Sequence, residues 1–315
     1  MAPPITLTLT SRSKKPIKKL PATIEVPHDA SVEEVKILIA RETGCDDFNR
    51  IGLFDPTTNK TLKNRRALIS EEAGVLSKKQ LLVKDLGPQV AWRTVFVIEY
   101  FGPIFFHVLI PLVRPYLYRF WPYVYKSEAE TPMTQVQWLL FALFNIHFLK
   151  REWETLFVHK FSANTMPVSN IVRNSAFYWL MAGLLSAWHI YAPGSPADRT
   201  ELGPLDYAGL AIFVVCEVCN WLVHQHLSSL RKPGGTEKGI PNCIGSSLVT
   251  CPNYMFEVLA WVGVIMISRS FAVVIFIVNG IVYMRSWSKG KEKALRAEFG
   301  DRYKKKQYTM IPGLI

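Results

Sequence analysis

Six apolar stretches follow Trp92, and they constrain the fold of this chain more than any other feature. They lie near residues 94–120, 134–149, 175–192, 206–227, 248–267 and 270–287. A helix of about 20 apolar residues is long enough to cross the hydrocarbon core of a bilayer. The sequence therefore predicts an all-α transmembrane domain of about six spans over residues 87–315, in contact with membrane lipid.

The links between these stretches alternate in charge. Lys and Arg accumulate near 150–173, near 228–247 and in the C-terminal tail, whereas the links near 121–133 and 193–205 balance their charges. Basic links tend to stay on the cytosolic side of a membrane. We therefore expect both termini in the cytosol. A basic membrane rim also explains the formal charge of +12 better than nucleic-acid binding does, so no nucleic-acid partner is predicted.

Residues 1–86 are polar and have the pattern of a separate α+β domain. The run ITLTLTS alternates as a strand does, ATIEV is a second extended run, and RIGLF and QLLVKDL are further short strands. Between them, Ser31 and Glu34 form a predicted capping box and Gly44 ends the helix. The order resembles the ubiquitin-like (β-grasp) fold. The domain lacks the terminal diglycine of a conjugating protein, so we interpret it as an appended cytosolic module.

Ionisable and amide side chains recur at helical spacing within the apolar half. They are Glu99 and His107 in the first stretch, His147, Lys150, Arg151 and Glu154 at the end of the second, Glu217, Asn220, His224 and Arg231 in the fourth, and Asn253, Tyr254 and Glu257 in the fifth. Any one of them could be an interfacial anchor or an interhelical hydrogen bond. Together they favour an intramembrane site, because buried ionisable groups are expensive in a bilayer. Such a cavity, open to the cytosol, suits an anionic soluble ligand.

Several common sites are not indicated by the sequence. There is no GxGxxG or GxxxxGK[ST] motif, no repeated histidine box and no GxSxG motif. The histidines of HQH at 224–226 diverge on a helix, so no metal site is predicted. Cys216 and Cys219 imitate a CxxC motif inside an apolar run, where two small membrane-helix residues are the better interpretation.

Several long motifs resemble those of the very-long-chain enoyl-CoA reductases. They are LGPQVAWRTVFVIEYFGP, WETLFVHKFSANTMP, TCPNYMFEVLAWVG and the tail EFGDRYKKKQYTMIPGLI, which is similar to the ending of steroid 5α-reductases. The likeness runs from about Leu86 to the C-terminus, and an N-terminal ubiquitin-like domain also belongs to this group.

The resemblance implies a multi-pass enzyme of the endoplasmic reticulum membrane that reduces trans-2-enoyl-CoA to acyl-CoA with NADPH. This is the last step of each fatty-acid elongation cycle, which also feeds sphingolipid synthesis. The implied partners are an acyl-CoA substrate and other elongation enzymes: the condensing enzyme, the ketoacyl reductase and the dehydratase.

Site residues are carried over by motif. The resemblance implies Tyr254 as the proton donor, with Gln89 and Glu99 binding the thioester or supporting that acid. It implies NADPH contacts from Lys150, Arg151, Asn220, His224, Arg231, Asn253, Glu257 and Tyr303.

Three positions depart from the pattern of the related reductases. Glu292 and Leu295 occupy places where the family commonly has His and Tyr, which puts cofactor contacts there in doubt. Phe148 stands where related reductases carry a Tyr acid. Two alternatives remain: a membrane reductase of a steroid or polyprenol double bond, and a non-catalytic scaffold whose ubiquitin-like domain recruits partners.

Overall fold

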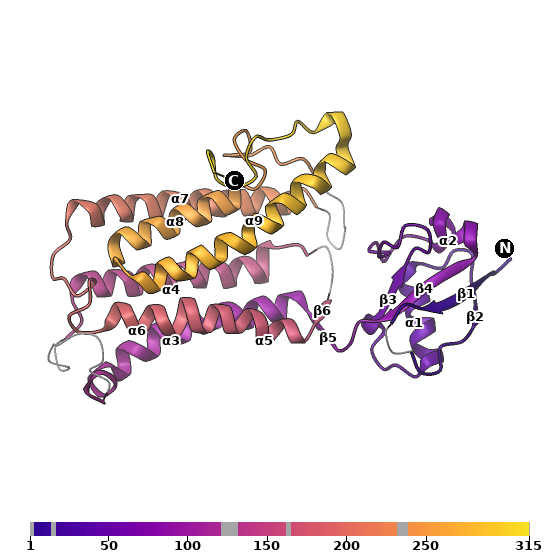
Figure 1. Cartoon of the computed structure of the whole chain (residues 1–315), viewed down its shortest axis with the longest axis horizontal. Coiled ribbons are helices and arrows are strands. Elements are labelled where there is room, and N and C mark those ends of the chain that lie inside the picture. The colour runs from indigo at the N-terminus through magenta and orange to yellow at the C-terminus, as the bar shows by residue number, and fades with distance from the viewer. Residues whose placement is uncertain (1–2, 14–16, 121–131, 162–164, 232–238, 315) are drawn as a thin grey trace. The chain divides into compact units, whose positions relative to one another are not determined.

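The computed structural model describes residues 3–13, 17–120, 132–161, 165–231 and 239–314, which form two compact units (Figure 1). The first consists of described residues in Met1–Trp92 and Phe161–Asn170. The second consists of described residues in Arg93–Lys160, Ile171–Pro233 and Glu237–Ile315. Each unit has its own hydrophobic core.

The first unit contains a four-stranded mixed sheet. Its elements are β1 (Ile5–Ser11), β2 (Thr23–Val26), α1 (Val32–Thr43), β3 (Ile51–Phe54), α2 (Ala73–Lys78) and β4 (Gln80–Asp85). The strand order is β2-β1-β4-β3, in which β1 and β4 are parallel and the other two pairs are antiparallel. The strands predicted from ITLTLTS, ATIEV, RIGLF and QLLVKDL are therefore confirmed.

Helix α1 begins and ends where the sequence predicts. The hydroxyl of Ser31 accepts a hydrogen bond from the Glu34 amide at 3.2 Å, and the Glu34 carboxylate accepts one from the Ser31 amide at 2.7 Å. Gly44 ends the helix with a φ of 68°, a left-handed conformation that glycine adopts without strain. The buried face of α1, with Val35 and Ile39, packs into the core of the sheet.

The second unit is helical. Its main helices are α3 (Trp92–Phe120), α4 (Gln135–Trp153), α5 (Ser169–Ser175), α6 (Ser186–Tyr191), α7 (Pro204–Ser229), α8 (Pro252–Ser268) and α9 (Phe271–Phe299). A π-helical turn, Glu154–Val158, extends α4, and a π-helical segment, Ala176–Leu185, joins α5 to α6. Each of the six predicted apolar stretches therefore contains helical structure.

Three described helices are long and apolar enough to cross a membrane: Trp92–Arg119, Pro204–Ser229 and Phe271–Arg302. The helix Pro252–Ser268 is apolar but has only 17 residues. The total of six spans stays a prediction.

Helices α7 and α8 run side by side (Figure 1), and they approach each other closely at a pair of glycines. A Cβ added to Gly209 would lie 2.6 Å from the Gly263 carbonyl oxygen, and a Cβ added to Gly263 would lie 2.5 Å from the Gly209 carbonyl oxygen. Neither separation is compatible with a side chain, so only glycine allows the two backbones to meet. This contact fixes the distance between the polar residues that the two helices carry farther along.

The fifth apolar stretch, predicted near 248–267, is helical only from Pro252 onward. Val249 forms a parallel β-bridge with Tyr308 of the C-terminal tail. The Cys251 amide donates to the Thr309 carbonyl at 2.9 Å. Helix α8 begins at Pro252 because proline at the first helical position needs no amide partner. The tail therefore holds the N-terminal end of α8.

Candidate active site

Charged and amide side chains gather, buried or half-buried, where α4, α7 and α8 meet. We call them the charged cluster, which consists of His147, Lys150, Arg151, Glu154, Glu217, Asn220, His224, Asn253 and Glu257. The four residues from α4 and its π-helical turn follow at steps of three, one and three. The three residues from α7 follow at steps of three and four. Both spacings place the side chains on one face of a helix, as the sequence predicts.

His147 lies between two carboxylates from different helices. Its Nδ1 atom is 2.7 Å from Glu217 Oε1 on α7, and its Nε2 atom is 3.3 Å from Glu257 Oε1 on α8. An imidazole donates from both nitrogens only when it is the imidazolium. The indole of Trp261 also donates to Glu257 Oε1, at 3.1 Å. His147 therefore connects α4 to both neighbouring helices.

Lys150 and Asn220 continue the network. The Lys150 ammonium lies 2.7 Å from Glu217 Oε2 and donates to Asn220 Oδ1 at 2.8 Å. The Asn220 amide in turn donates to the Asn253 carbonyl at 2.9 Å and to Glu257 Oε2 at 3.3 Å. Asn220 is thereby oriented, with its oxygen toward a cation and its nitrogen toward α8.

Arg151 organises the other half of the cluster. Its guanidinium donates to Glu154 Oε2 and, at 3.0 Å, to the hydroxyl of Tyr100 on α3. His224 Nδ1 lies 3.0 Å from Glu154 Oε2 and 3.1 Å from the guanidinium. The side chain of Glu154 is fully buried, so these partners supply the compensation that a buried carboxylate requires.

Three potential metal ligands also gather here. Ligand atoms of Glu154, His159 and His224 lie within 4.8 Å of one another. The Arg151 guanidinium already contacts two of the three and brings a positive charge to the place where a metal ion would bring one. The prediction of no metal site stays a prediction.

Tyr254 lies on the first turn of α8, next to Asn253 of the cluster. Its side chain packs against the helical core, and its hydroxyl makes no hydrogen bond within the described part of the chain. The side-chain oxygen of Asn253 is buried and likewise has no hydrogen-bond partner among the described residues. Both polar groups are therefore available to a ligand.

Glu99 is buried on α3, and its Oε2 atom has no hydrogen-bond partner among the residues that the structure describes. Gln89 belongs to the first unit, in the two-stranded sheet of β5 (Gln89–Ala91) and β6 (Thr165–Pro167). Its amide donates to the carbonyls of Leu86 and Gly87. The roles implied for Glu99 and Gln89 stay predictions.

Two implied cofactor contacts make their hydrogen bonds outside the charged cluster. Arg231 donates to the Lys160 carbonyl at 2.7 Å, and the Lys160 ammonium donates back to the Arg231 carbonyl at 2.6 Å. Tyr303, in the tail, donates to Glu292 Oε2 at 2.6 Å and to Thr250 Oγ1 at 3.3 Å. Burial and the hydrogen bond to Glu292 raise the pKa of this phenol.

The positions that depart from the family pattern have structural partners. Glu292 accepts a hydrogen bond from the Thr250 hydroxyl at 2.5 Å in addition to the one from Tyr303. Leu295 is buried, and Phe148 packs in the core of the second unit. Phe148 is next to His147 of the cluster and has no group that could donate a proton.

The catalytic and cofactor roles implied by the resemblance left out five residues that complete the network: Tyr100, His147, Glu154, Glu217 and Trp261. Three of them, His147, Glu154 and Glu217, were already among the polar residues whose helical spacing favours an intramembrane site. Tyr100 and Trp261 carry no such signal, because aromatic residues are common in apolar helices.

The arrangement can hold a polar ligand and supply a proton to it. Two cations, Lys150 and Arg151, face three carboxylates, so the cluster itself is closely balanced when His147 is an imidazolium. The amide oxygen of Asn253 and the phenol of Tyr254 supply an acceptor and a donor at the edge of this network. Such a balanced network fixes side chains before a ligand arrives.

Comparisons with known proteins cover the chain almost from end to end. A family model described as 3-oxo-5-alpha-steroid 4-dehydrogenase matches residues 164–315. The very-long-chain enoyl-CoA reductase of Dictyostelium discoideum is 32% identical over 98% of this chain and 98% of its own length. A putative enoyl reductase of Schizosaccharomyces pombe is 35% identical, over 98% of this chain and 99% of that protein. A putative enoyl-CoA reductase of Trypanosoma brucei brucei is 38% identical, over the same shares.

Proposed function

This chain belongs to the very-long-chain enoyl-CoA reductase family, and from that premise we propose that it reduces trans-2-enoyl-CoA to saturated acyl-CoA with NADPH. The observation that carries the proposal is the Tyr254 hydroxyl, which has no partner among the described residues and lies beside the buried charged cluster. A phenol in that position can give a proton to a reduced double bond.

The donor set of the charged cluster fits a pyridine nucleotide. NADPH, when bound, supplies the hydride that enters at the β-carbon. The unpartnered Asn253 oxygen would accept from a carboxamide, and the carboxylate of Glu257 would accept from a ribose hydroxyl. Lys150 and Arg151 contribute positive charge near phosphate groups, while Asn220 and His224 hold these side chains in place.

Proton delivery falls to Tyr254. Reduction at the β-carbon places negative charge on the thioester oxygen and leaves the α-carbon to be protonated. The Tyr254 hydroxyl donates that proton. We assign Glu99 and Gln89 to binding of the thioester or support of this acid, the roles that the motif resemblance implies.

We also propose the finer architecture that the sequence predicts. The sheet order β2-β1-β4-β3, with β1 parallel to β4 and α1 between β2 and β3, supports a ubiquitin-like (β-grasp) domain over residues 1–86. The three long apolar helices support a multi-pass membrane domain over residues 87–315, for which we propose six spans in the endoplasmic reticulum membrane with both termini cytosolic. As partners we propose the other enzymes of fatty-acid elongation.

The decisive experiment uses the purified full-length protein in detergent. NADPH oxidation is followed with a C18 to C26 trans-2-enoyl-CoA, and in parallel with an enone steroid, because the matched family model carries a steroid description. We expect oxidation with the enoyl-CoA and formation of saturated acyl-CoA. Turnover of the steroid alone would overturn the acyl-CoA assignment, and absence of both turnover and NADPH binding would favour a scaffold.

A further inference from the structure

Tyr100 is a buried phenol whose proton has no acceptor in the described part of the chain. The residue lies on α3 with its side chain 4% exposed, and its hydroxyl accepts a hydrogen bond from the Arg151 guanidinium at 3.0 Å. A guanidinium can only donate, so this bond leaves the hydroxyl proton of Tyr100 unused. A buried donor in that state is unfavourable unless a ligand accepts from it.

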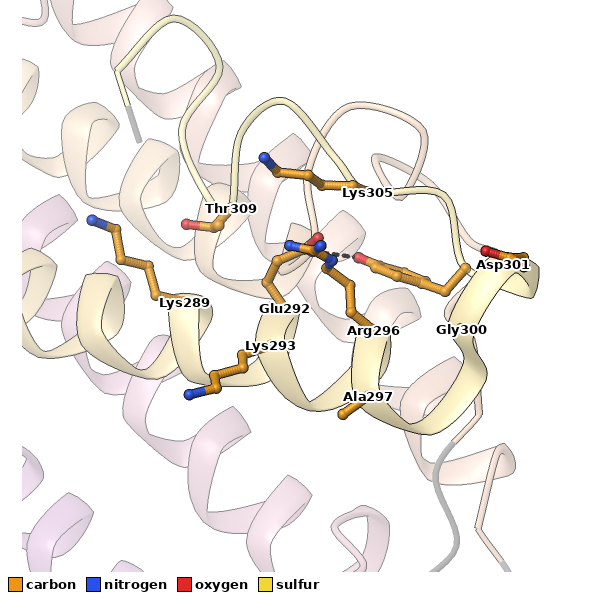
Figure 2. Close-up of a pocket in the computed structure, with 10 residues that line it drawn as sticks. Lys289, Glu292, Lys293, Arg296, Ala297, Gly300, Asp301, Lys305 and Thr309 are labelled. Carbon is orange, nitrogen blue, oxygen red and sulfur yellow. Dashed lines mark hydrogen bonds between the residues drawn. The ribbon is translucent and has the colours of Figure 1, made fainter.

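The other buried tyrosines of the described chain are Tyr118, Tyr191 and Tyr303. Each donates its proton within the protein. Tyr118 donates to a backbone carbonyl of α6 at 2.5 Å, and Tyr303 donates to Glu292 Oε2 at 2.6 Å, the bond drawn as a dashed line in Figure 2. Tyr191 lies 2.6 Å from His107 Nδ1, which accepts because Nε2 of the neutral ring donates to a backbone carbonyl. Tyr100 is therefore the exception among these four phenols.

Arg151 makes the Tyr100 hydroxyl a stronger donor. The guanidinium is held by Glu154 and by His224, and its central carbon lies 5.1 Å from the centre of the Tyr100 ring. A hydroxyl that accepts a hydrogen bond from a cation donates more strongly to its own acceptor, because the two bonds polarise each other. The acceptor that suits such a donor is an oxygen that gains negative charge.

Aromatic neighbours fix the direction of the Tyr100 ring. The ring is stacked on Phe96 at a centroid distance of 5.8 Å, meets Tyr178 edge to face at 5.2 Å and is tilted against Phe148 at 6.3 Å. These neighbours come from α3, the π-helical segment Ala176–Leu185 and α4. The hydroxyl is thus oriented before a substrate arrives, and a preorganised donor is what stabilises charge that develops in a transition state.

Tyr100 shares its surroundings with the proposed acid, Tyr254. Tyr254 packs against the hydrophobic core to which Tyr100 belongs, and the two phenols are close enough to interact electrostatically. Tyr100 is bonded to Arg151 of the charged cluster, and Tyr254 follows Asn253 of the same cluster. The thioester oxygen of an enoyl-CoA is two bonds from the α-carbon. A substrate that brings its α-carbon to Tyr254 therefore brings this oxygen into the neighbourhood of Tyr100.

We propose that the Tyr100 hydroxyl donates a hydrogen bond to the thioester oxygen of the enoyl-CoA during reduction. Hydride forms the new bond at the β-carbon, the electron pair of the double bond moves toward the carbonyl, and the thioester oxygen carries most of the negative charge of the resulting enolate. Tyr100 keeps its proton. Tyr254 gives its own proton to the α-carbon, and the carbonyl forms again. This assignment rests on the proposed function, because it adds a catalytic residue to the same reaction.

The first test compares Tyr100→Phe with Tyr118→Phe in the full-length protein in detergent. Both variants lose one buried hydroxyl from α3 and one hydrogen bond, but only Tyr100 has a free proton. We expect kcat for enoyl-CoA reduction to fall by about 10²–10³-fold in Tyr100→Phe, the range for loss of one oxyanion donor, with the KM for enoyl-CoA little changed. Tyr118→Phe should keep the wild-type kcat. Equal values of kcat in the two variants would overturn the proposal.

The second test reads the hydrogen bond itself. The probe is para-dimethylaminocinnamoyl-CoA, titrated without NADPH, because a donor at its thioester oxygen polarises the conjugated system and shifts its absorption to the red. We expect this shift with the wild type and Tyr118→Phe, whereas Tyr100→Phe should bind the probe and lose most of the shift. A full shift with Tyr100→Phe would show that Tyr100 acts only by positioning Arg151, and the assignment would be wrong.

A third protein covers the case in which Tyr100→Phe does not fold. Replacement of Tyr100 by 3-fluorotyrosine keeps the side chain and makes the phenol more acidic, so the red shift of the bound probe should increase. An unchanged shift would count against the assignment. The two proposals remain distinguishable. A probe shift that depends on Tyr100 in a protein without NADPH-dependent reduction would refute the proposed function alone, and wild-type turnover by Tyr100→Phe would refute this inference alone.

Discussion

Tyr254 is the single residue on which the proposed chemistry depends. Its hydroxyl has no partner among the described residues, so Tyr254→Phe removes a proton donor and breaks no hydrogen bond of the described chain. We expect kcat to fall by about 10²–10⁴-fold, the range for loss of a general acid, with the KM for NADPH little changed. Steady-state kinetics measure both values. The control is Tyr283→Phe, a residue half-exposed on α9. Full activity of Tyr254→Phe would remove this tyrosine from the mechanism.

Glu217 joins two of the three helices of the charged cluster, because it contacts both His147 and Lys150. The change Glu217→Gln leaves a buried ammonium without its carboxylate, and breaking a buried pair costs about 3–5 kcal/mol. We expect a lower apparent Tm in detergent. The double variant Glu217→Gln/Lys150→Met should recover part of the loss, since it removes the stranded charge. If the decreases in Tm caused by the two single changes simply added in the double variant, Glu217 and Lys150 would not be coupled.

Residue spacing predicts most of the charged cluster but not its internal pairing. The steps between Glu217, Asn220 and His224 place them on one face of a helix, and the structure confirms that they meet the residues of α4 and α8. Which carboxylate pairs with which cation depends on how α4, α7 and α8 pack, and periodicity within one helix carries no such information. For that reason the central position of His147 emerged only from the structure.

At the scale of elements, the contact of Gly209 with Gly263 determines how closely α7 and α8 approach. A methyl group at Gly209 would lie 2.6 Å from the Gly263 carbonyl oxygen, so Gly209→Ala must push the helices apart. We expect a lower apparent Tm. We also expect weaker NADPH binding, because Asn220 on α7 donates a hydrogen bond to Glu257 on α8, and this bond is lost when the helices separate. Thermal unfolding and cofactor titration measure the two effects. Gly290→Ala on α9, where an added Cβ meets nothing within 4 Å, should be tolerated.

Element boundaries were predictable where a local signal determines them. Ser31, Glu34 and Gly44 delimit α1 through their own hydrogen bonds and backbone conformation. The start of α8 was predicted too early, because Val249 is apolar but pairs with Tyr308, almost 60 residues later in the sequence. A pairing over that sequence distance depends on the tertiary structure, and no local sequence pattern predicts it.

At the scale of the whole molecule, the two units have separate hydrophobic cores, so we expect each unit to unfold with its own free energy of unfolding. In the first unit, burial together with the nearby guanidinium of Arg65 lowers the pKa of Lys36 to about 8. Lys36 keeps its proton up to about pH 10.4 in the unfolded chain, but loses it above about pH 8 in the folded protein. Between these two pH values the unfolded state holds more protons, so the free energy of unfolding rises with pH. Below pH 8 both states are protonated and the gain is absent.

A fragment of residues 1–92 tests this expectation. Its free energy of unfolding, measured with denaturant and circular dichroism, should rise by about 2 kcal/mol between pH 8 and pH 10 relative to Lys36→Met. The methionine variant keeps the length of the side chain and lacks the titrating group. A wild type and a variant with parallel pH profiles would show that Lys36 does not couple protonation to folding.

The tail that pairs with Val249 has a consequence for how the protein is made. The amides of Thr250 and Cys251 bond to carbonyls of Tyr308 and Thr309, and Met310 is fully buried. Tyr308 and Thr309 follow both α8 and α9 in the sequence, so the end of α8 that carries Tyr254 acquires these hydrogen bonds only after α9 and the tail have been synthesised. A chain cut before Tyr308 would keep every described helix but would lack the backbone partners of this end of α8.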